Sequence, residues 1–250
     1  MSRIITPRRV LILPSKRLQR GSMVLDAFRF GASDPYFSSV VSLLHFDGAD
    51  GSTTFTDEKG KVWTPAGNAQ IDTSLGYNTG LFDGTGDYIT SPAHADWNFG
   101  SGDWTVEAWL VQNATSGTDA VFGQWGVNDC CSLLSLGGSA VALDLTTSGS
   151  YQAGNALVSA AGVITVGTLH HVEWTRDGST TRIYVDGVQA ASKAFTGTLW
   201  NSSRVVHVAG NSQGAYDSNI HVRQFRATKG ICRHPGGTSF TPPPVPFPSS

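Results

Sequence analysis

The centre of the chain alternates hydrophobic and polar residues with a period of two, the pattern of a β-strand with one buried face. Over residues 104–111 the apolar positions fall on one side, namely Trp104, Val106, Ala108 and Leu110. In the run 181–186, Ile183 and Val185 share the inward side, and Tyr184 faces outward. These runs predict strands that each bury one face against a common core.

The segments between these runs carry turn signals. Asp-Gly pairs, which suit turns with two residues at positive φ, occur at 47–48, 50–51, 83–84, 177–178 and 186–187. The last two bracket a strand, so residues 174–189 predict a three-stranded meander. The run 220–226 loses its alternation at Gln224-Phe225, which indicates a β-bulge. Without a helix-length period, and with only a short helical turn expected near 93–99, the chain predicts an all-β sandwich or barrel.

Composition fits that class. The chain has 250 residues, of which 40% are hydrophobic, enough for the core of one large sandwich. Only 14% are charged, and 29 glycines supply turn conformations. The three cysteines, Cys130, Cys131 and Cys232, form no disulfide framework, so we expect reduced thiols and synthesis in a reducing cytoplasm. The longest apolar run near the start, residues 10–13, is too short for a secretory signal or a membrane span.

Charge is distributed unevenly. The first 20 residues hold six basic residues and no acid: Arg3, Arg8, Arg9, Lys16, Arg17 and Arg20. We therefore expect residues 1–38 to form a basic, extended arm that anchors the protein on a partner protein. Nucleic acid is a less favoured partner, because the arm lacks interleaved aromatic residues and a nucleic-acid-binding fold. Residues 39–229 form the predicted sandwich, and the Pro-rich residues 230–250 predict an extended tail packed on the domain or on a neighbour.

Several segments resemble those of laminin-G-like and concanavalin A-like jelly-roll domains. They are "LFDGTGDYI" at 81–89, "WTVEAWL" at 104–110 and "HHVEWTRDGSTTRIYVDGVQ" at 170–189. The resemblance implies a two-sheet antiparallel jelly-roll sandwich. Family members often hold Ca²⁺ at a rim, and Asp83 and Asp87 are the candidate ligands here, although turn chemistry explains Asp83-Gly84 equally well. The last strand reads Asn219–Arg223 without the acidic pair common in the family, which weakens a metal site, and no cofactor is required.

A narrower resemblance is to the version of this domain in tailed-bacteriophage structural proteins. It rests on "LLHFDGADGSTTFTD" at 43–57, "FGSGDWTVE" at 99–107, and "FRATKGICR" at 225–233 followed by "FTPPPVPFP". It implies a virion protein, made in the host bacterial cytoplasm, that docks on other virion proteins by its arm. The expected part is a tail-fibre or tail-tip subunit that attaches to the host surface; the alternative is a capsid decoration or head-fibre protein. A homo-oligomer is expected, with a trimer as first guess.

A glycan-degrading enzyme is a third alternative. Jelly-roll glucanases use two carboxylates about 5 Å apart, set along one strand. Glu107 and Glu173 each stand alone on their strands, and Asp144 has no acidic partner two residues away. The adjacent His170 and His171 point to opposite faces of one strand, so they do not share a metal. We expect no catalysis.

Binding of a host-surface glycan needs aromatic platforms with polar neighbours on an exposed loop. Three loops offer such groups, around residues 125–129, 200–201 and 211–219. The candidate ligand-binding residues are Trp125, Asn128, Asp129, Trp200, Asn211, Tyr216 and Asp217. The alternative role of Trp125 and Trp200 is that of core or interface aromatics.

Overall fold

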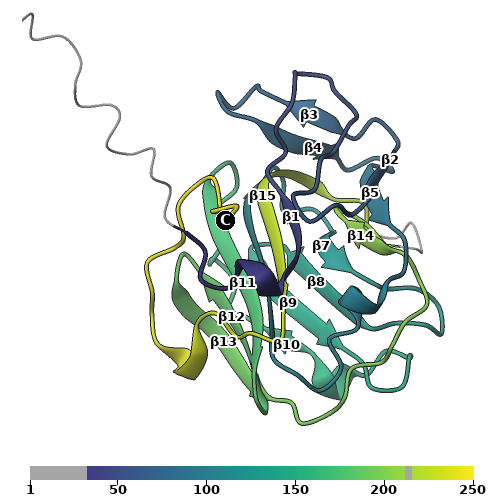
Figure 1. Ribbon diagram of the computed structural model, residues 1–250, viewed down its shortest axis with the longest axis vertical. Helices are drawn as coiled ribbons and strands as arrows, with labels where there is room; N and C mark the ends of the chain where they lie inside the picture. Colours follow the sequence, from purple (N-terminus) through teal and green to yellow (C-terminus); the bar gives the residue numbers. More distant parts are fainter. Residues whose placement is uncertain (1–32, 212–215) are drawn as a thin grey trace, which may run out of the picture. The chain divides into compact units, whose positions relative to one another are not determined.

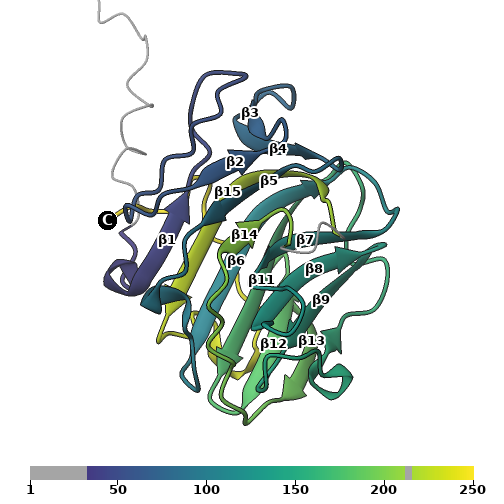
Figure 2. The same cartoon turned by 90° about the vertical axis from the view of Figure 1, so that its right-hand side faces the viewer.

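The computed structural model describes residues 33–211 and 216–250, and these form an all-β sandwich of two antiparallel sheets (Figures 1 and 2). The predicted fold class is confirmed. The six basic residues of the predicted arm, Arg3, Arg8, Arg9, Lys16, Arg17 and Arg20, lie outside the described residues. In the part of the chain that is described, no helix has the length and apolar character needed to cross a membrane.

The larger sheet has eight strands in the order β13-β12-β11-β6-β15-β4-β3, and β1 also pairs with β15. Its strands are β1 (Val40–Leu44), β3 (Gln70–Asp72), β4 (Thr79–Asp83), β6 (Trp104–Gln112), β11 (Leu169–Asp177), β12 (Thr180–Val185), β13 (Val188–Ala194) and β15 (Asn219–Lys229). In the structure β6 pairs with β15 and β11, although more than 50 residues separate β6 from each of them. Neighbouring strands therefore bring together side chains from distant parts of the chain.

The smaller sheet has seven strands in the order β10-β9-β8-β7-β14-β5-β2. Its strands are β2 (Thr64–Ala66), β5 (Tyr88–Ser91), β7 (Thr118–Gly123), β8 (Ser132–Gly137), β9 (Ala140–Leu145), β10 (Leu157–Val158) and β14 (Val206–Val208). Short 3-10 turns lie at η1 (Phe37–Ser39), η2 (Ala95–Trp97), η3 (Ala153–Asn155) and η4 (Pro235–Gly237). The turn expected near residues 93–99 is η2.

The core lies between the two sheets. The alternating positions predicted to face inward all belong to it: Trp104, Val106, Ala108, Leu110, Ile183 and Val185. Aromatic rings fill its centre. The ring centroid of Trp97 lies 6.0 Å from that of Trp63 and 5.7 Å from that of Phe122, and the centroid of Phe225 lies 5.3 Å from that of Phe122. Burying such rings supplies several kcal/mol each, since truncating a buried Phe or Trp to Ala costs about 3–5 kcal/mol.

Local sequence features behave as expected. Asp186 and Gly187 have φ of 49° and 77°, so both residues of the β12–β13 turn are left-handed, as in a type I′ hairpin. The register of β15 against β6 shifts between Val222 and Gln224, which confirms the predicted bulge. All three cysteines are free thiols, and burial raises the pKa of Cys131 to about 12. The reduced state expected for them is therefore the state the structure has.

The outer face of the eight-stranded sheet is covered by the two ends of the described chain. The C-terminal segment, yellow in Figure 1, runs beside β11, β12 and β13, where the Phe240 N–H donates to Gly187 O at 2.9 Å. Phe247 is 1% exposed and packs on Val40 and Leu43 of β1. The Asp34 N–H donates to Ser250 O at 2.7 Å, so residues that we had assigned to the arm and to the tail hold each other on this face.

An ion network lies beneath this cover. The Arg226 guanidinium is 2.9 Å from Glu107 Oε1 and 3.0 Å from Asp34 Oδ2. Arg233 of the C-terminal segment adds a second cation, 2.8 Å from Asp34 Oδ2. Burial alone would raise the pKa of Glu107, but the Arg226 charge and the hydrogen bond with His171 hold it well below its usual range. This network ties β6 and β15 to both chain ends.

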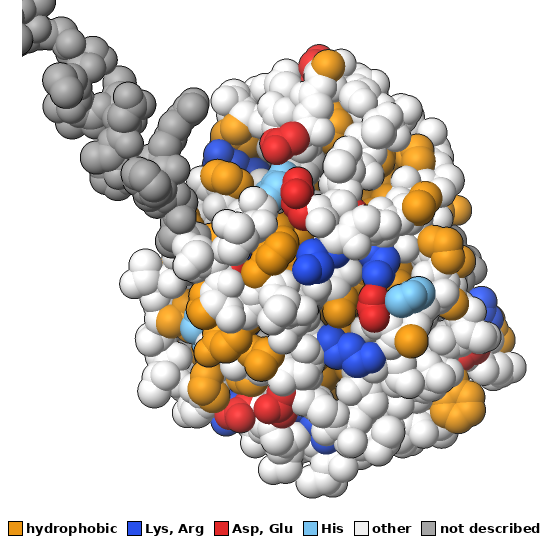
Figure 3. Space-filling view, in the orientation of Figure 1, with side chains coloured by type: hydrophobic (Ala, Val, Ile, Leu, Met, Phe, Trp, Pro, Cys, Tyr) orange, Lys and Arg blue, Asp and Glu red, His pale blue; other side chains and the backbone are white. Residues whose placement is uncertain are grey.

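The surface seen from the same side carries acidic and basic side chains interspersed among uncharged ones (Figure 3). A protein that binds the phosphate backbone of nucleic acid presents a broad basic surface instead. On the face shown, the charges of the described residues do not take that form.

Candidate ligand-binding site

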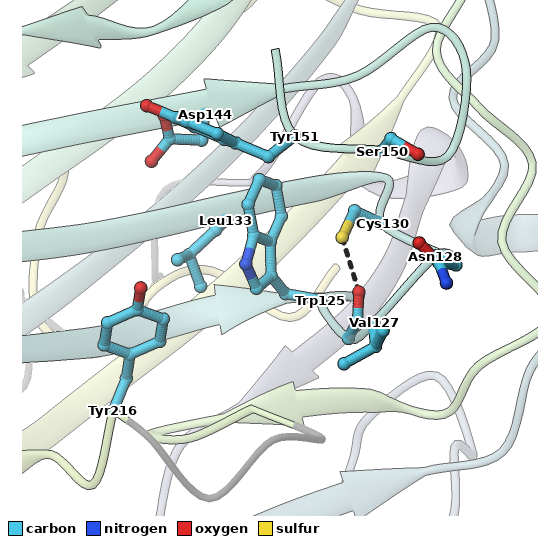
Figure 4. A pocket seen from close by; sticks show the side chains of 10 residues that line it. Trp125, Val127, Asn128, Cys130, Leu133, Asp144, Ser150, Tyr151 and Tyr216 are labelled. Atoms are coloured by element: carbon cyan, nitrogen blue, oxygen red, sulfur yellow. Dashed lines mark hydrogen bonds between the residues drawn. The ribbon is translucent and has the colours of Figure 1, made fainter. Parts of the chain in front are cut away.

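A cavity of about 440 Å³ opens on the outer face of the seven-stranded sheet (Figure 4). It lies beside the loops that follow β7 and β9 and the segment that precedes β15. The residues that line it are Trp125, Gly126, Val127, Asn128, Cys130, Leu133, Asp144, Ser150, Tyr151 and Tyr216. The set combines aromatic rings with a few polar groups, as ligand pockets generally do.

Strand alternation forms the floor of the pocket. Leu133 of β8 and Asp144 of β9 stand opposite each other across the two strands. Their neighbours Leu134 and Leu143 face the core and are fully buried. Because successive strand residues point to opposite faces, Leu133 and Asp144 point outward, into the pocket.

Aromatic side chains form the walls. The Trp125 ring, 6% exposed, packs in a small cluster with Ala120, Cys130 and Leu133 that lies apart from the main core. Tyr151 is 60% exposed, with its ring centroid 6.0 Å from that of Trp125 and an interplanar angle of 72°. Tyr216 packs against the same cluster. Three aromatic side chains from different parts of the chain therefore line the cavity.

The polar groups of the pocket differ in how they are occupied. Cys130 Sγ donates to Gly126 O at 2.6 Å, which closes the loop on itself. Asn128 is exposed at φ 57°, a left-handed conformation that Asn tolerates better than most residues. Asp144 is the one charged side chain among the described residues that line the cavity, and burial raises its pKa. Its carboxylate has no hydrogen bond to another described residue.

Of the predicted ligand-binding residues, Trp125, Asn128 and Tyr216 line this pocket together. Two others lie beside it. The Trp200 Nε1–H donates to Asp129 Oδ1 at 2.8 Å, and Ser203 donates to Asp129 Oδ2 through its N–H and its hydroxyl. Asp129 therefore holds the loop before β14 in place and does not line the cavity.

Trp200 is 40% exposed and flanks the pocket from that loop. It packs on Gly149, where a Cβ would lie 2.9 Å from the indole, one residue before the lining residue Ser150. Asn211 is buried and Asp217 is half-buried, and neither lines this cavity. The structure thus divides the predicted set into lining residues, flanking residues and residues outside the pocket.

Among the lining residues that sequence analysis did not select, Asp144 and Tyr151 matter most for the chemistry of the pocket. Val141, Leu143 and Leu145 alternate with Ala142 and Asp144, a pattern that places Asp144 outward, but the search for a second acid on the same strand passed over it. The signal that marks it is a single charge on the outer face of an interior strand. Tyr151 carries no pattern of its own, because it reaches Trp125 only through the fold.

The two carboxylates proposed for calcium serve a turn. Asp87, fully buried, accepts from the N–H groups of Asn68 at 2.7 Å and Asp83 at 3.1 Å. Asp83 accepts from the side-chain amide of Asn68 and from the N–H of Thr85, and these bonds lower its pKa. Among the described residues, no three His, Cys, Asp or Glu side chains are grouped so as to hold a metal ion.

Glu107 and Glu173 are not as isolated as the sequence indicated. They stand directly opposite each other on β6 and β11, and both are fully buried. A search along single strands does not detect such a pair, because the partner comes from another strand. Glu173 Oε2 lies 2.6 Å from the His234 ring, which Phe240 covers at a centroid distance of 3.4 Å. Burial raises the pKa of Glu173, and the C-terminal segment seals the pair.

The chain belongs to the concanavalin A-like lectin/glucanases superfamily, whose laminin-G-type family model matches residues 83–226. This confirms the resemblance to laminin-G-like and concanavalin A-like jelly-roll domains that the sequence shows. A search of curated proteins finds no match.

Solved structures of toxin binding domains share the fold. The binding domain of Paraclostridial Mosquitocidal Protein 1 matches with a TM-score of 0.61 and 14% identity, covering 79% of this chain and 50% of that chain. The botulinum neurotoxin serotype D binding domain matches with a TM-score of 0.59 and 12% identity, over 80% and 50%. The binding domain of Botulinum Neurotoxin DC in complex with SialylT gives 0.58 and 15%, over 79% and 50%. This chain spans about half the length of these proteins, and the low identity shows a common fold alone.

Proposed function

We propose that this chain is a non-catalytic binding module that recognises a cell-surface glycan through the pocket around Trp125. The observation that carries the proposal is the convergence of Trp125, Tyr151 and Tyr216 with the Asp144 carboxylate on an open sheet face. Flat aromatic rings supply apolar contact area, and a few polar groups fix the orientation of a ligand. That combination suits a sugar, which has both apolar and hydroxyl-bearing surfaces.

The related structures support a recognition role. The structures named above are of toxin binding domains, a botulinum neurotoxin C/D mosaic receptor binding domain has the same fold, and one of the set was solved in complex with SialylT. We transfer from them the class of activity, attachment to a surface receptor, and not the particular ligand. The pocket proposed here is built from residues of this chain, and its ligand is to be found by experiment.

The non-catalytic part of the proposal rests on the placement of the acids. Glycoside hydrolysis in most families needs two carboxyl groups beside one bond. Among the described lining residues of the pocket, Asp144 is the only acid. The Glu107–Glu173 pair has no exposed surface, and its carboxylates are held by Arg226, His171 and His234.

We further propose that the protein is a virion appendage subunit, a tail-fibre or tail-tip part, that displays this pocket toward the host. The phage-like segments and the basic residues 1–20 support this context. A capsid decoration or head-fibre protein is the second candidate. Deleting residues 2–32 tests the arm and spares Asp34, which belongs to the ion network of the sandwich. We expect the shortened protein to fold but to be absent from particles; normal incorporation would rule out anchoring by this arm.

A glycan array tests the binding function. We expect the wild-type chain to bind a subset of glycans, and Tyr151→Ala to lose at least about tenfold in affinity, a difference of about 1.4 kcal/mol. Tyr151 is 60% exposed, so its removal costs the fold little. Val188→Ala is the matched control, because Val188 is 59% exposed on the other sheet. Absence of glycan binding, or equal binding by both variants, would contradict the proposal.

A further inference from the structure

The pocket has an unusual charge for a site lined by aromatic rings. Asp144 supplies one negative charge, and the part of the chain that is described contributes no positive side chain to the lining. We propose that the pocket binds a positively charged ammonium group, either the primary ammonium of an amino sugar or a quaternary ammonium such as choline. The proposal rests on the proposed function, because it specifies the ligand of the same site.

Asp144 differs from the other shielded aspartates of the chain. Asp119 accepts from Gln112 Nε2 at 2.8 Å and from the Asn219 N–H at 2.7 Å. Asp57 accepts from the Trp63 indole at 2.9 Å, and both oxygens of Asp87 accept from backbone N–H groups. For Asp144, burial is the one influence that shifts its pKa, and it acts against the charged form. A carboxylate placed without a donor is satisfied best by a ligand that brings a cation or donors of its own.

The rings around Asp144 favour the cation. The faces of Trp and Tyr rings carry negative electrostatic potential, so an ammonium group placed over them is attracted. In Figure 4 the Asp144 carboxylate, the Tyr151 ring and the Tyr216 ring lie around the Trp125 indole. Because the Tyr151 and Trp125 planes meet at 72°, they form two walls of a corner rather than one flat platform. A corner of rings with a carboxylate offers an ammonium group both aromatic faces and a counter-charge.

The nearest arginine of the loop is engaged elsewhere. The Arg204 guanidinium packs on Gly126, where an added Cβ would clash with it, and its Nη2 donates to Val127 O at 2.8 Å. It therefore braces the backbone of the lining loop and is absent from the residues that line the cavity. The charge of Asp144 remains directed at the opening.

Matched small ligands test the inference. The probes are glucosamine against N-acetylglucosamine, which differ by an ammonium and a neutral amide, and choline against glucose. Binding is followed by NMR at the Trp125 indole N–H, up to about 50 mM ligand, which detects millimolar Kd values. We expect glucosamine or choline to bind at least about tenfold more tightly than its neutral counterpart, and the preferred probe identifies a primary or a quaternary ammonium as the source.

The Asp144→Asn variant keeps the size of the side chain and removes its charge. We expect it to reduce the preference for the ammonium probe to less than about twofold while neutral ligands bind as before. Asp217→Asn is the matched control, because it makes the same charge change at a half-buried residue outside the lining. It should leave the preference intact.

The inference is overturned if N-acetylglucosamine or glucose binds as tightly as its charged counterpart, or if neither ammonium probe perturbs Trp125. It is also overturned if Asp217→Asn abolishes the preference as fully as Asp144→Asn. Each of these results leaves the glycan array as a separate test of the proposed function. Neutral glycans that bind on the array in a Tyr151-dependent manner would preserve that function while this inference fails.

Discussion

The outer faces of the two sheets treat polar side chains in opposite ways. On the eight-stranded sheet, Glu107, Glu173 and His171 are fully buried beneath the C-terminal segment. On the seven-stranded sheet, Asp144 and Tyr151 line a pocket that is open to solvent. Both faces carry acids and aromatic rings, so the kinds of residue present do not separate a structural face from a binding face.

What separates the faces is whether the charges already have partners. Glu107 is shared among Arg226 of β15, Arg233 of the C-terminal segment and His171 of β11. Such a network stabilises one arrangement of strands and chain ends. Asp144 has no comparable partner among the described residues. The strand residue directly opposite it is Leu133, which is apolar. The acids of the eight-stranded sheet are paired with residues of the chain itself, whereas Asp144 on the seven-stranded sheet is available to a ligand.

The largest expected effect comes from breaking the covered network. Arg226→Met keeps much of the side-chain volume but removes one of the two guanidinium groups that Glu107 and Asp34 share, leaving Arg233 as the other. Removing one partner of a buried ion pair costs about 3–5 kcal/mol of the free energy of unfolding, measured by chemical denaturation. Arg223→Met on the same strand is the control, since Arg223 is half-buried over the Tyr77 ring at 4.0 Å, and we expect a cost below about 1 kcal/mol. Equal costs for the two variants would refute the assignment of the network as structural.

Removing an anchor of the C-terminal segment should have a slightly smaller effect. Phe247 is 1% exposed between β1 and Arg226, whose guanidinium lies 4.3 Å from the ring centroid. Phe247→Ala should lower the free energy of unfolding by about 3 kcal/mol, the low end for a buried Phe. Tyr151→Ala on the open face should change it by less than about 0.5 kcal/mol. A thermal midpoint unchanged in Phe247→Ala would mean that the segment does not cover the sheet in solution.

Period-two alternation and turn chemistry are local, so they predicted the all-β class, and the family resemblance added the two-sheet jelly roll. Val106 and Ile183 are placed inside by their own neighbours, and the Asp186-Gly187 turn is set by two residues. The candidate site was predicted only in part, because it depends on register between strands. Asp144 and the Glu107–Glu173 pair gain their meaning from residues on other strands. Trp125 was found because an aromatic ring in a polar loop is visible in the sequence itself.

The pH dependence of stability tests whether burial shifts the pKa of a histidine on the seven-stranded sheet. His207 of β14 is 3% exposed beside Tyr88, and burial lowers its pKa to about 4. In the unfolded chain the His pKa is near 6.5, so on acidification the unfolded state takes up a proton at a higher pH than the folded state does. The stabilising contribution of His207 is therefore present above pH 6.5 and is lost as pH falls toward 4. We expect this residue to account for about 1 kcal/mol of lost stability between pH 7 and 5.5.

The measurement compares the wild-type chain with His207→Gln by denaturation at both pH values. The variant should lose about 1 kcal/mol less than the wild type over this interval. The interval lies above the region in which carboxylates such as Glu107 begin to protonate in the unfolded chain. An identical loss in both proteins would show that the His207 pKa is not lowered by its surroundings.

The smallest expected effect is that of Asp144→Asn on the free energy of unfolding, and the sign of that effect is what matters. Burial raises the pKa of Asp144, so this carboxyl favours folding in its protonated form. That contribution is lost as pH rises above the pKa that Asp144 has in the unfolded chain and through its folded pKa. At pH 7 the ionised group opposes folding, and Asp144→Asn should leave stability unchanged or raise it by up to about 0.5 kcal/mol.

Asp119→Asn on β7 of the same sheet provides the contrast. Asp119 is also shielded, but its oxygens accept from Gln112 and Asn219, and an amide there would oppose one donor with another. We expect that variant to lose about 1–2 kcal/mol in the same denaturation experiment. If Asp144→Asn were as destabilising as Asp119→Asn, Asp144 would have an internal partner in solution. A neutral or stabilising Asp144→Asn would instead mean that the fold keeps this charge without gaining stability from it, as a carboxylate kept for a ligand should behave.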